Sequence, residues 1–588
     1  MSNKKTKIIS FITSLILIVF IWHNFKISGN NIIYALIFAG IVVLNYYLLN
    51  GLKKRTAIIA SIIGFGFSIV EILGKSLMID NSLTHVVDKW LPINILGYFL
   101  IGAELVILLF KIFEKDYSKV ENKKLISINE KINIHPWITF AITTALIFVA
   151  YLPFFLRFFP GILTGDSIDQ VYQTMGLNPL NSHHPLIHTF FIGIFTGLGK
   201  NVFGNINVGI ALYSITQMII VAVSFSSILE FLRRKNVSII LRIVALLFFM
   251  FYLPNAIYSV TMWKDVLFSI WAMLFVANIY ELFTNTEYYL GKKRNWIFFA
   301  IITLLFMFAK KNGMYIVVPT LFIVFVFLMK KYWKKLLPLF VGTMIIYFII
   351  EFITFNVVKV PKGSEKEMLS IPLQQIARTV ATYKDEIDQE TLDTVDRFFV
   401  VDNIEDYYNP RISDPVKGNI NEEYYKEHKG EFWSLWFKLL KMKPGSYITA
   451  FLANSFGYYY IETNYWVTLK NLDDNELDIN RTPIISEEVD KVVPYGELEG
   501  YSRDTIVFNI GLFFWLAVIT LGYTIYKKKY KEIILFIPLA LIWATMILSP
   551  VYAEYRYGYP LVLSLVVLMI LAISRNKQTE NERGEENG

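Results

Sequence analysis

The chain contains no cysteine among its 588 residues. This absence excludes disulfide bonds, thiolate metal sites and a cysteine nucleophile. The sequence also lacks a GxxxxGK(S/T) phosphate-binding loop and a GxGxxG dinucleotide motif. We find no internal repeat with a period of roughly 20 to 50 residues. Nucleotide-driven chemistry on a cytoplasmic side therefore has no visible site.

Charged residues are also scarce, at 18% of the chain, whereas 55% of the residues are hydrophobic and 16% are aromatic. The mean hydropathy of +0.47 is far above that of soluble domains of this size. The net charge of +8 comes from Lys and Arg in short clusters between apolar runs, not from a basic face with interleaved aromatic residues. We therefore predict an all-α polytopic membrane protein that has no nucleic acid partner.

The apolar runs predict about fourteen crossings of about 20 residues each. The first run is not followed by a small-x-small cleavage site, so we interpret it as an uncleaved span. The predicted spans lie near residues 8–22, 32–50, 56–74, 92–110, 137–157, 206–232, 239–258, 264–283, 296–309, 313–330, 335–355, 506–526, 532–550 and 557–573.

Basic clusters between the runs indicate the orientation. Under the positive-inside rule, the clusters at 53–55 and 527–531 face the cytoplasm, and so do both termini. The Gly-rich segment 188–200 must then lie along the outer surface, because a crossing there would place the cations at 233–235 outside. Heavy use of Ile, Lys, Asn, Tyr and Phe favours an AT-rich bacterial genome, so we expect a multi-pass protein of the bacterial cytoplasmic membrane.

This order divides the chain into five regions, with juxtamembrane helices on the outer side. A mixed outer region between the eleventh and twelfth spans combines a charged helix near 386–396 with an aromatic stretch at 431–460 that Pro444 interrupts. The regions are an N-terminal membrane module of about four spans (1–135), a membrane core with the outward loop 158–188 (136–355), the extracytoplasmic region (356–505), three further spans (506–574) and a cytoplasmic tail (575–588).

The outward loop 158–188 collects most of the candidate chemistry. It holds Asp166, Asp169 and Gln170, and ionisable groups beside a bilayer indicate function by default. In the structural alternative, Asp166 is a helix N-cap and Asp169 lies near the helix dipole. In the functional interpretation, Asp166 is a general base with a pKa raised by desolvation, and Asp169 orients it or binds an acceptor hydroxyl. The sequence indicates no certain cofactor, and a divalent metal at Asp166 and Asp169 stays open if water or phosphate completes its shell.

Other polar groups recur at the outer ends of predicted spans. The pair His183 and His184 lies in the same loop and can hold a phosphate or a sugar, although a histidine at such a turn is often structural. Cations on the outer side oppose the positive-inside rule and indicate an anionic partner such as a lipid phosphate, although snorkelling alone would explain a lysine at a helix end. The further substrate-binding candidates are Lys264, Asp265, Lys310, Lys311, Arg556 and Tyr557.

These features in this order resemble the GT-C superfamily of integral membrane glycosyltransferases, and the loop FPGILTGDSIDQ with HHP is most similar to a poorly characterised bacterial branch. The resemblance covers most of residues 140–574, through short motifs. It implies a polyprenyl-phosphate-linked sugar as donor, a catalytic role for Asp166, and phosphate binding by Lys310, Lys311 and Arg556. The chain departs from the family in having about four extra spans before the loop.

The resemblance therefore implies a hexosyl or pentosyl transferase that acts on an envelope glycan or lipid acceptor at the outer face. Sugar transfer there cannot use cytoplasmic nucleotide sugars, so a lipid must carry the donor. Attack assisted by a single base implies inversion at the anomeric carbon. A transporter or lipid flippase is the alternative from another class, and it predicts internal repeats and charges near the bilayer midplane. An envelope-polymer polymerase or ligase would share the lipid-phosphate donor.

Overall fold

The computed structural model describes residues 3–25, 31–117, 123–463, 465–467, 475–486, 500–502, 506–548 and 551–574. Within these ranges, eleven helices are long and apolar enough to cross a membrane, or twelve if the bent pair α10 (Ile239–Phe251) and α11 (Leu253–Ser259) forms one span. The prediction of a helical polytopic membrane protein is therefore confirmed. The predicted tail 575–588 lies outside the described residues.

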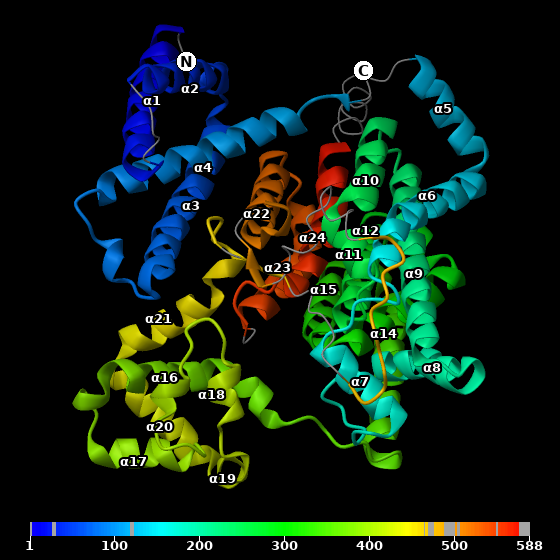
Figure 1. Cartoon of the computed structure of the whole chain (residues 1–588). Coiled ribbons are helices and arrows are strands. Elements are labelled where there is room, and N and C mark those ends of the chain that lie inside the picture. The colour runs from blue at the N-terminus through cyan, green and yellow to red at the C-terminus, as the bar shows by residue number, and fades with distance from the viewer. Residues whose placement is uncertain are drawn as a thin grey trace.

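The first four long helices form a module at one side of the molecule (Figure 1). Close helix packing is possible there because Gly64 on α3 faces the backbone of α4, and a Cβ at Gly64 would lie 2.6 Å from the carbonyl oxygen of Phe99. The module comprises α1 (Asn3–Phe25), α2 (Asn31–Leu49), α3 (Lys54–Asp80) and α4 (Leu91–Phe113), and α3 also packs on α22 (Ile510–Tyr526).

The larger group of helices surrounds α12 and α24, which contact each other and are the most deeply buried of the candidate spans. Apolar residues cover most of the surface of both helices, as expected for helices that pack on protein on nearly all sides. The helices of this group are α5 (Lys123–Ile134), α6 (Pro136–Arg157), α7 (Gly165–Met175), α8 (Leu186–Phe203), α9 (Ile206–Arg234), α10, α11, α12 (Lys264–Thr284), α13 (Thr286–Leu290), α14 (Lys293–Ala309), α15 (Asn312–Phe352), α23 (Ile537–Ile547) and α24 (Tyr555–Ser574).

Helix α15 differs from the prediction of two spans at 313–330 and 335–355, because it runs without a break for 41 residues. It nevertheless turns back on itself. A straight helix would place Tyr347 about 51 Å from Gly313. However, the Tyr347 ring stacks on Phe308 at 4.8 Å, and Phe308 lies only a few residues before Gly313. The two legs of α15 therefore lie side by side, and the reversal between them falls between Gly313 and Phe340, which stacks on Phe299 of α14.

Helix α8 occupies the segment predicted to lie along the outer surface. It has 18 residues and is long and apolar enough to cross a membrane. In Figure 1 it runs across the lower end of the bundle, at a steep angle to α9. The surface position of this segment stays a prediction.

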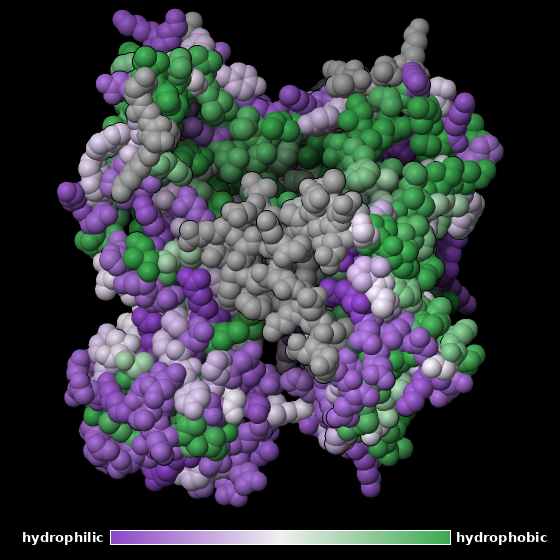
Figure 2. Space-filling model, in the orientation of Figure 1, coloured by the Kyte–Doolittle hydropathy of each residue, from purple (hydrophilic) through white to green (hydrophobic). Residues whose placement is uncertain are grey.

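A separate cluster of short helices forms its own hydrophobic core between Leu369 and Tyr447 (the α16–α21 cluster). It lies at the same end of the molecule as α7, and its surface is mainly hydrophilic (Figures 1 and 2). The predicted charged helix and the break at Pro444 are both present, as α17 and as the boundary between α20 and α21. The cluster contains α16 (Ser370–Tyr383), α17 (Gln389–Arg397), α18 (Asp414–Gly418), α19 (Glu422–Glu427), α20 (Lys429–Met442) and α21 (Pro444–Ser455).

A short antiparallel pair of strands, β1 (Tyr465–Val467) and β2 (Gly500–Ser502), follows this cluster and is a small departure from the all-α prediction. The start of α1 and the end of α24 lie toward the end of the molecule opposite α7 (Figure 1).

Candidate functional site

Two loops that are distant in the sequence join at the start of the candidate site. Ile162 accepts a backbone hydrogen bond from Met262 at 2.9 Å and donates one to Val260 at 2.9 Å. This bridge holds the loop before α7 against the loop before α12. Thr164 is the N-cap of α7, so the structural alternative in which Asp166 is itself the N-cap is wrong, and the Asp166 carboxylate is available for tertiary contacts.

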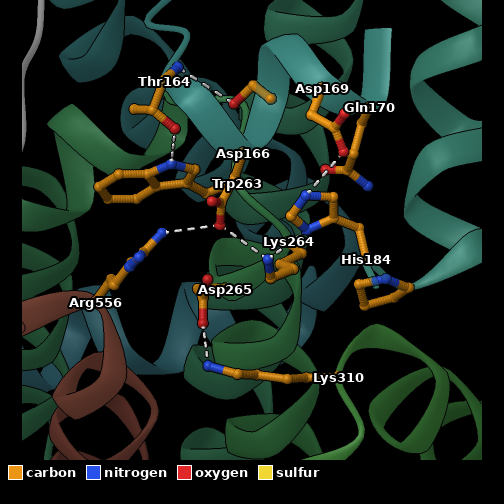
Figure 3. A network of polar contacts seen from close by, with 12 residues as sticks. Thr164, Asp166, Asp169, Gln170, His184, Trp263, Lys264, Asp265, Lys310 and Arg556 are labelled. Carbon is orange, nitrogen blue, oxygen red and sulfur yellow. Dashed lines mark hydrogen bonds and ion pairs between the residues drawn. The ribbon is translucent and has the colours of Figure 1, made fainter. Parts of the chain in front are cut away.

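Asp166 lies between two cations, as Figure 3 shows. Its Oδ2 accepts hydrogen bonds from Lys264 Nζ at 2.9 Å and from Arg556 Nη1 at 3.2 Å. The Arg556 guanidinium stacks over the Trp263 ring at 4.8 Å, and the Trp263 indole donates to Thr164. The first turns of α7, α12 and α24 are therefore joined through one carboxylate.

The electrostatics of Asp166 correct the sequence prediction of a raised pKa. Burial alone would raise the pKa of this carboxyl group, but the charges of Lys264 and Arg556 outweigh burial. The pKa of Asp166 is therefore held well below its ordinary value of 3.8. In this arrangement the carboxylate is a weak base.

Asp265 and Lys310 form a second ion pair directly beneath the first (Figure 3). Lys310 Nζ lies 2.6 Å from Asp265 Oδ1 and 4.0 Å from the centre of the Tyr557 ring. Asp265 is only 2% exposed, and its Oδ2 has no hydrogen-bond partner among the described residues. Asp265, Lys310 and Tyr557 thus belong to the same buried polar cluster as Asp166.

His184 connects the second loop carboxylate to this cluster. Its Nδ1 lies 2.9 Å from Lys264 Nζ and its Nε2 lies 3.3 Å from Asp169 Oδ2. Burial and then the charge of Lys264 lower the pKa of His184 to about 4, so the ring is neutral at neutral pH. Since Lys264 can only donate, the ring proton belongs on Nε2, facing Asp169. His184 therefore links Asp169 to Lys264.

The alternative of a divalent metal at Asp166 and Asp169 does not fit this geometry. Asp166 faces two cations, whereas Asp169 accepts hydrogen bonds from Gln173 and Asn178, each at 2.8 Å. Within the described residues, no group of three or more His, Asp or Glu side chains converges as metal ligands do. The two carboxylates therefore do not share a site.

Three of the predicted residues lie apart from the cluster. His183 is exposed, and Lys311 is exposed with its Nζ beside Gly363. Gln170 on α7 is buried, and its side chain hydrogen bonds with Thr189 at 2.8 Å and with His188 at 3.0 Å. For Gln170 the structure thus indicates a supporting role, and it does not place His183 or Lys311 at Asp166.

Sequence reasoning missed two buried groups at the site. His188 bonds through its second nitrogen to Tyr213 OH at 2.8 Å and so braces α7 against α9. Glu554 is 2% exposed, and its Oε1 lies 3.6 Å from Arg556 Nε. Burial raises the pKa of Glu554 to about 7. Its position two residues before Arg556, at the edge of a predicted span, is a signal that could have identified it.

The arrangement combines a carboxylate with three cations, Lys264, Lys310 and Arg556, at the end of the bundle where α7 lies. Asp265 neutralises Lys310, whereas Lys264 and Arg556 both face the partly exposed Asp166. Charged and bidentate donors of this kind bind phosphate well. Chemically, the cluster offers an anion site with a proton acceptor beside it.

One family model, described as a family of unknown function (DUF6020), matches residues 177–587. The match includes His184, Lys264, Lys310 and Arg556, whereas α7 with Asp166 precedes it. The comparisons with curated proteins and with solved structures gave no match.

Proposed function

The chain belongs to the family of unknown function DUF6020, and we propose that it is a membrane glycosyltransferase with its active site at Asp166. In this proposal it transfers a sugar from a polyprenyl-phosphate donor to an envelope glycan or lipid acceptor. The reaction takes place at the outer face of the bacterial cytoplasmic membrane. The observation that carries the proposal is the position of Asp166 Oδ2 between Lys264 Nζ, at 2.9 Å, and Arg556 Nη1, at 3.2 Å.

The two cations bind the phosphate of the donor. As the bond between the anomeric carbon and the phosphate oxygen breaks, negative charge develops on the phosphate, and Lys264 and Arg556 stabilise it. Both side chains are mostly buried, which strengthens this interaction relative to water. Lys310 contributes less directly, since Asp265 already pairs with it at 2.6 Å.

Asp166 accepts the proton of the acceptor hydroxyl as the new carbon–oxygen bond forms. Its low pKa in the free protein arises from Lys264 and Arg556. A bound phosphate shares those cations, so the proton affinity of Asp166 rises when the donor is in place. The base is thereby activated by the substrate, and attack from the face opposite the phosphate inverts the anomeric carbon.

The proposed orientation uses about fourteen crossings with both termini in the cytoplasm. Relative to the eleven candidate spans, α8 is placed on the outer surface and α15 counts as two crossings. The bent pair α10 and α11, together with α14 and α22, supplies three more crossings. Asp166 and the α16–α21 cluster then face outward together, in keeping with their position at one end of the molecule (Figure 1).

Envelope glycan analysis of a deletion strain complemented with variants tests this function. The strain carries wild-type protein, Asp166→Asn, or Asp385→Asn as a matched control, because Asp385 is an exposed aspartate outside the cluster. We expect Asp166→Asn to lower one specific sugar decoration by at least about 100-fold, as for loss of a general base. The lipid-linked donor should accumulate, and Asp385→Asn should behave as wild type.

Protein amounts in the membrane are compared by immunoblot for every strain. If Asp166→Asn restores the decoration fully while the empty vector does not, Asp166 is structural. A transporter or flippase would then explain the deletion phenotype better.

A further inference from the structure

Glu554 and Arg556 form an ion pair that is not closed. Glu554 Oε1 lies 3.6 Å from Arg556 Nε, beyond the usual hydrogen-bond distance, and both atoms are buried without a hydrogen-bond partner among the described residues. Fully ionised pairs of this type normally close to about 2.7–2.9 Å. The long distance indicates that Arg556 does not hold the Glu554 carboxyl group in the ionised state.

Glu554 interacts electrostatically with the charged residues of the anion site. The groups that act on it come from several elements, and they include both signs of charge. They are Arg556 and Tyr557 on α24, Tyr258 on α11, Asp265 on α12, Lys310 before α15 and Asp166 on α7. Lys264 on α12 is connected to Glu554 through its ion pair with Asp166. A change of charge at any of these positions therefore changes the proton affinity of Glu554.

The net charge of the cluster depends on whether Glu554 is protonated. When Glu554 is ionised, the three cations Lys264, Lys310 and Arg556 face three carboxylates, and the cluster is neutral. When Glu554 is protonated, the cluster keeps one positive charge. Burial already raises the pKa of Glu554 to about 7, so both states are accessible near neutral pH.

We propose that Glu554 takes up a proton when an anion occupies the site formed by Lys264 and Arg556, so that anion binding and proton uptake are coupled. The inference rests on the anion site of the proposed function and adds a regulatory group to it. An incoming anion repels the Glu554 carboxylate and competes for Arg556, and both effects favour the neutral carboxyl group. By linkage, protonated Glu554 in turn binds the anion more tightly.

The sign of the pH dependence follows from this coupling. Below the pKa of Glu554 the proton is already bound, and anion affinity is highest. As the pH rises through about 7, binding has to include proton uptake, and the affinity falls. His184 has a pKa near 4 and Asp166 a pKa well below 3.8, so in the free protein neither titrates in this range.

Calorimetry on the full chain in lipid nanodiscs tests the coupling with sulfate as the probe. Sulfate mimics a phosphate but does not itself titrate near neutral pH. Titrations at about pH 7.5 in two buffers of different ionisation enthalpy give the number of protons taken up per anion bound. We expect wild type to take up a large fraction of one proton, and its affinity to fall about three- to tenfold between about pH 6 and pH 8.

Three variants assign the proton. Glu554→Gln should bind sulfate with no uptake near neutral pH and with a flat pH profile. Glu71→Gln is the matched control, because Glu71 is also a buried glutamate, 1% exposed, but belongs to α3 in the N-terminal module. Glu71→Gln should keep the uptake, and so should His184→Asn if Glu554 is the group that binds the proton.

The outcomes separate this inference from the proposed function. Sulfate binding to wild type without proton uptake, or uptake that persists in Glu554→Gln, overturns the role of Glu554 and leaves the anion site intact. Absence of sulfate binding to wild type overturns the anion site and the coupling together. The wild-type measurement alone decides the coupling even if Glu554→Gln fails to fold.

Discussion

Arg556 joins three parts of the candidate site through one planar side chain. It donates to Asp166, stacks on Trp263 and lies beside Glu554. A lysine at this position would keep the charge but lose both the stacking and the forked donor geometry. The requirement for arginine can therefore be tested separately from the requirement for a cation.

We expect Arg556→Lys to lower the proposed transferase activity by about 30- to 150-fold, since a hydrogen bond to a charged group such as Asp166 is worth about 2–3 kcal/mol. The envelope decoration and the amount of protein in the membrane are both measured. Arg397→Lys on the exposed helix α17 is the control, because Arg397 pairs with Glu431 away from the site. Full activity of Arg556→Lys would show that only the charge matters.

The sequence identified seven members of this cluster, because each is an ionisable residue near the end of an apolar run. They are Asp166, His184, Lys264, Asp265, Lys310, Arg556 and Tyr557. The sequence could not predict the low pKa of Asp166, since Lys264 lies 98 residues away in the chain and Arg556 lies 390 residues away. His183 and Lys311 carry the same sequence signal as their neighbours His184 and Lys310. However, only His184 and Lys310 point into the cluster. The choice within each pair depends on loop conformation, which residue type does not determine.

At the scale of elements, the hairpin of α8 and α9 depends on glycine. A Cβ at Gly209 would overlap the carbonyl oxygen of Phe195 and lie 2.9 Å from the Cα of Thr196. A Cβ at Gly197 on α8 would meet no atom within 4 Å. The two glycines thus form a matched pair, since one faces a backbone and the other faces open space.

We expect Gly209→Ala to separate α8 from α9 and to lower the melting temperature of the purified protein by several degrees. Overpacking of this kind typically costs about 1–3 kcal/mol. Gly197→Ala should be neutral or slightly stabilising, because alanine favours a helix by about 1 kcal/mol over glycine. Equal melting temperatures for the two variants would contradict the close approach of the helices. The melting curves are recorded by intrinsic fluorescence in one detergent.

The reversal within α15 illustrates what apolar patterning predicts at this scale. The four lysines within 330–335 separate the two predicted apolar legs, and they lie within the segment between Gly313 and Phe340 where the helix reverses. They did not predict that the helix would continue through the boundary. Lysine is a good helix former, so the sequence marks a change of direction there without ending the hydrogen-bonded helix.

At the scale of the whole molecule, the absence of cysteine makes the topology directly measurable. Single cysteines can be introduced at Lys334 and at Asp385 and labelled in intact cells with a membrane-impermeant maleimide. We expect Asp385→Cys to react and Lys334→Cys to react only after the cells are opened, because Lys334 lies where α15 turns back. Labelling of Lys334→Cys in intact cells would contradict the proposed orientation.

Long apolar runs made the membrane class predictable, because each run alone satisfies the length of a crossing. The α16–α21 cluster was less predictable, since its core combines residues such as Leu373, Phe398 and Phe432 from short helices and the turn after α17. Its independent core arises from tertiary packing between short amphipathic segments, and their pattern does not specify which segments meet.

The ion pair of Asp265 and Lys310 also has a consequence for biosynthesis. Its members are 45 residues apart, so they can neutralise each other soon after both have left the ribosome. Arg556 is synthesised almost 250 residues later, at the start of α24. Early pairing lowers the cost of inserting two charges next to lipid while the bundle is incomplete. A nascent chain that stops before α24 would lack the guanidinium that faces Asp166, so that Lys264 alone would balance the charge of this carboxylate.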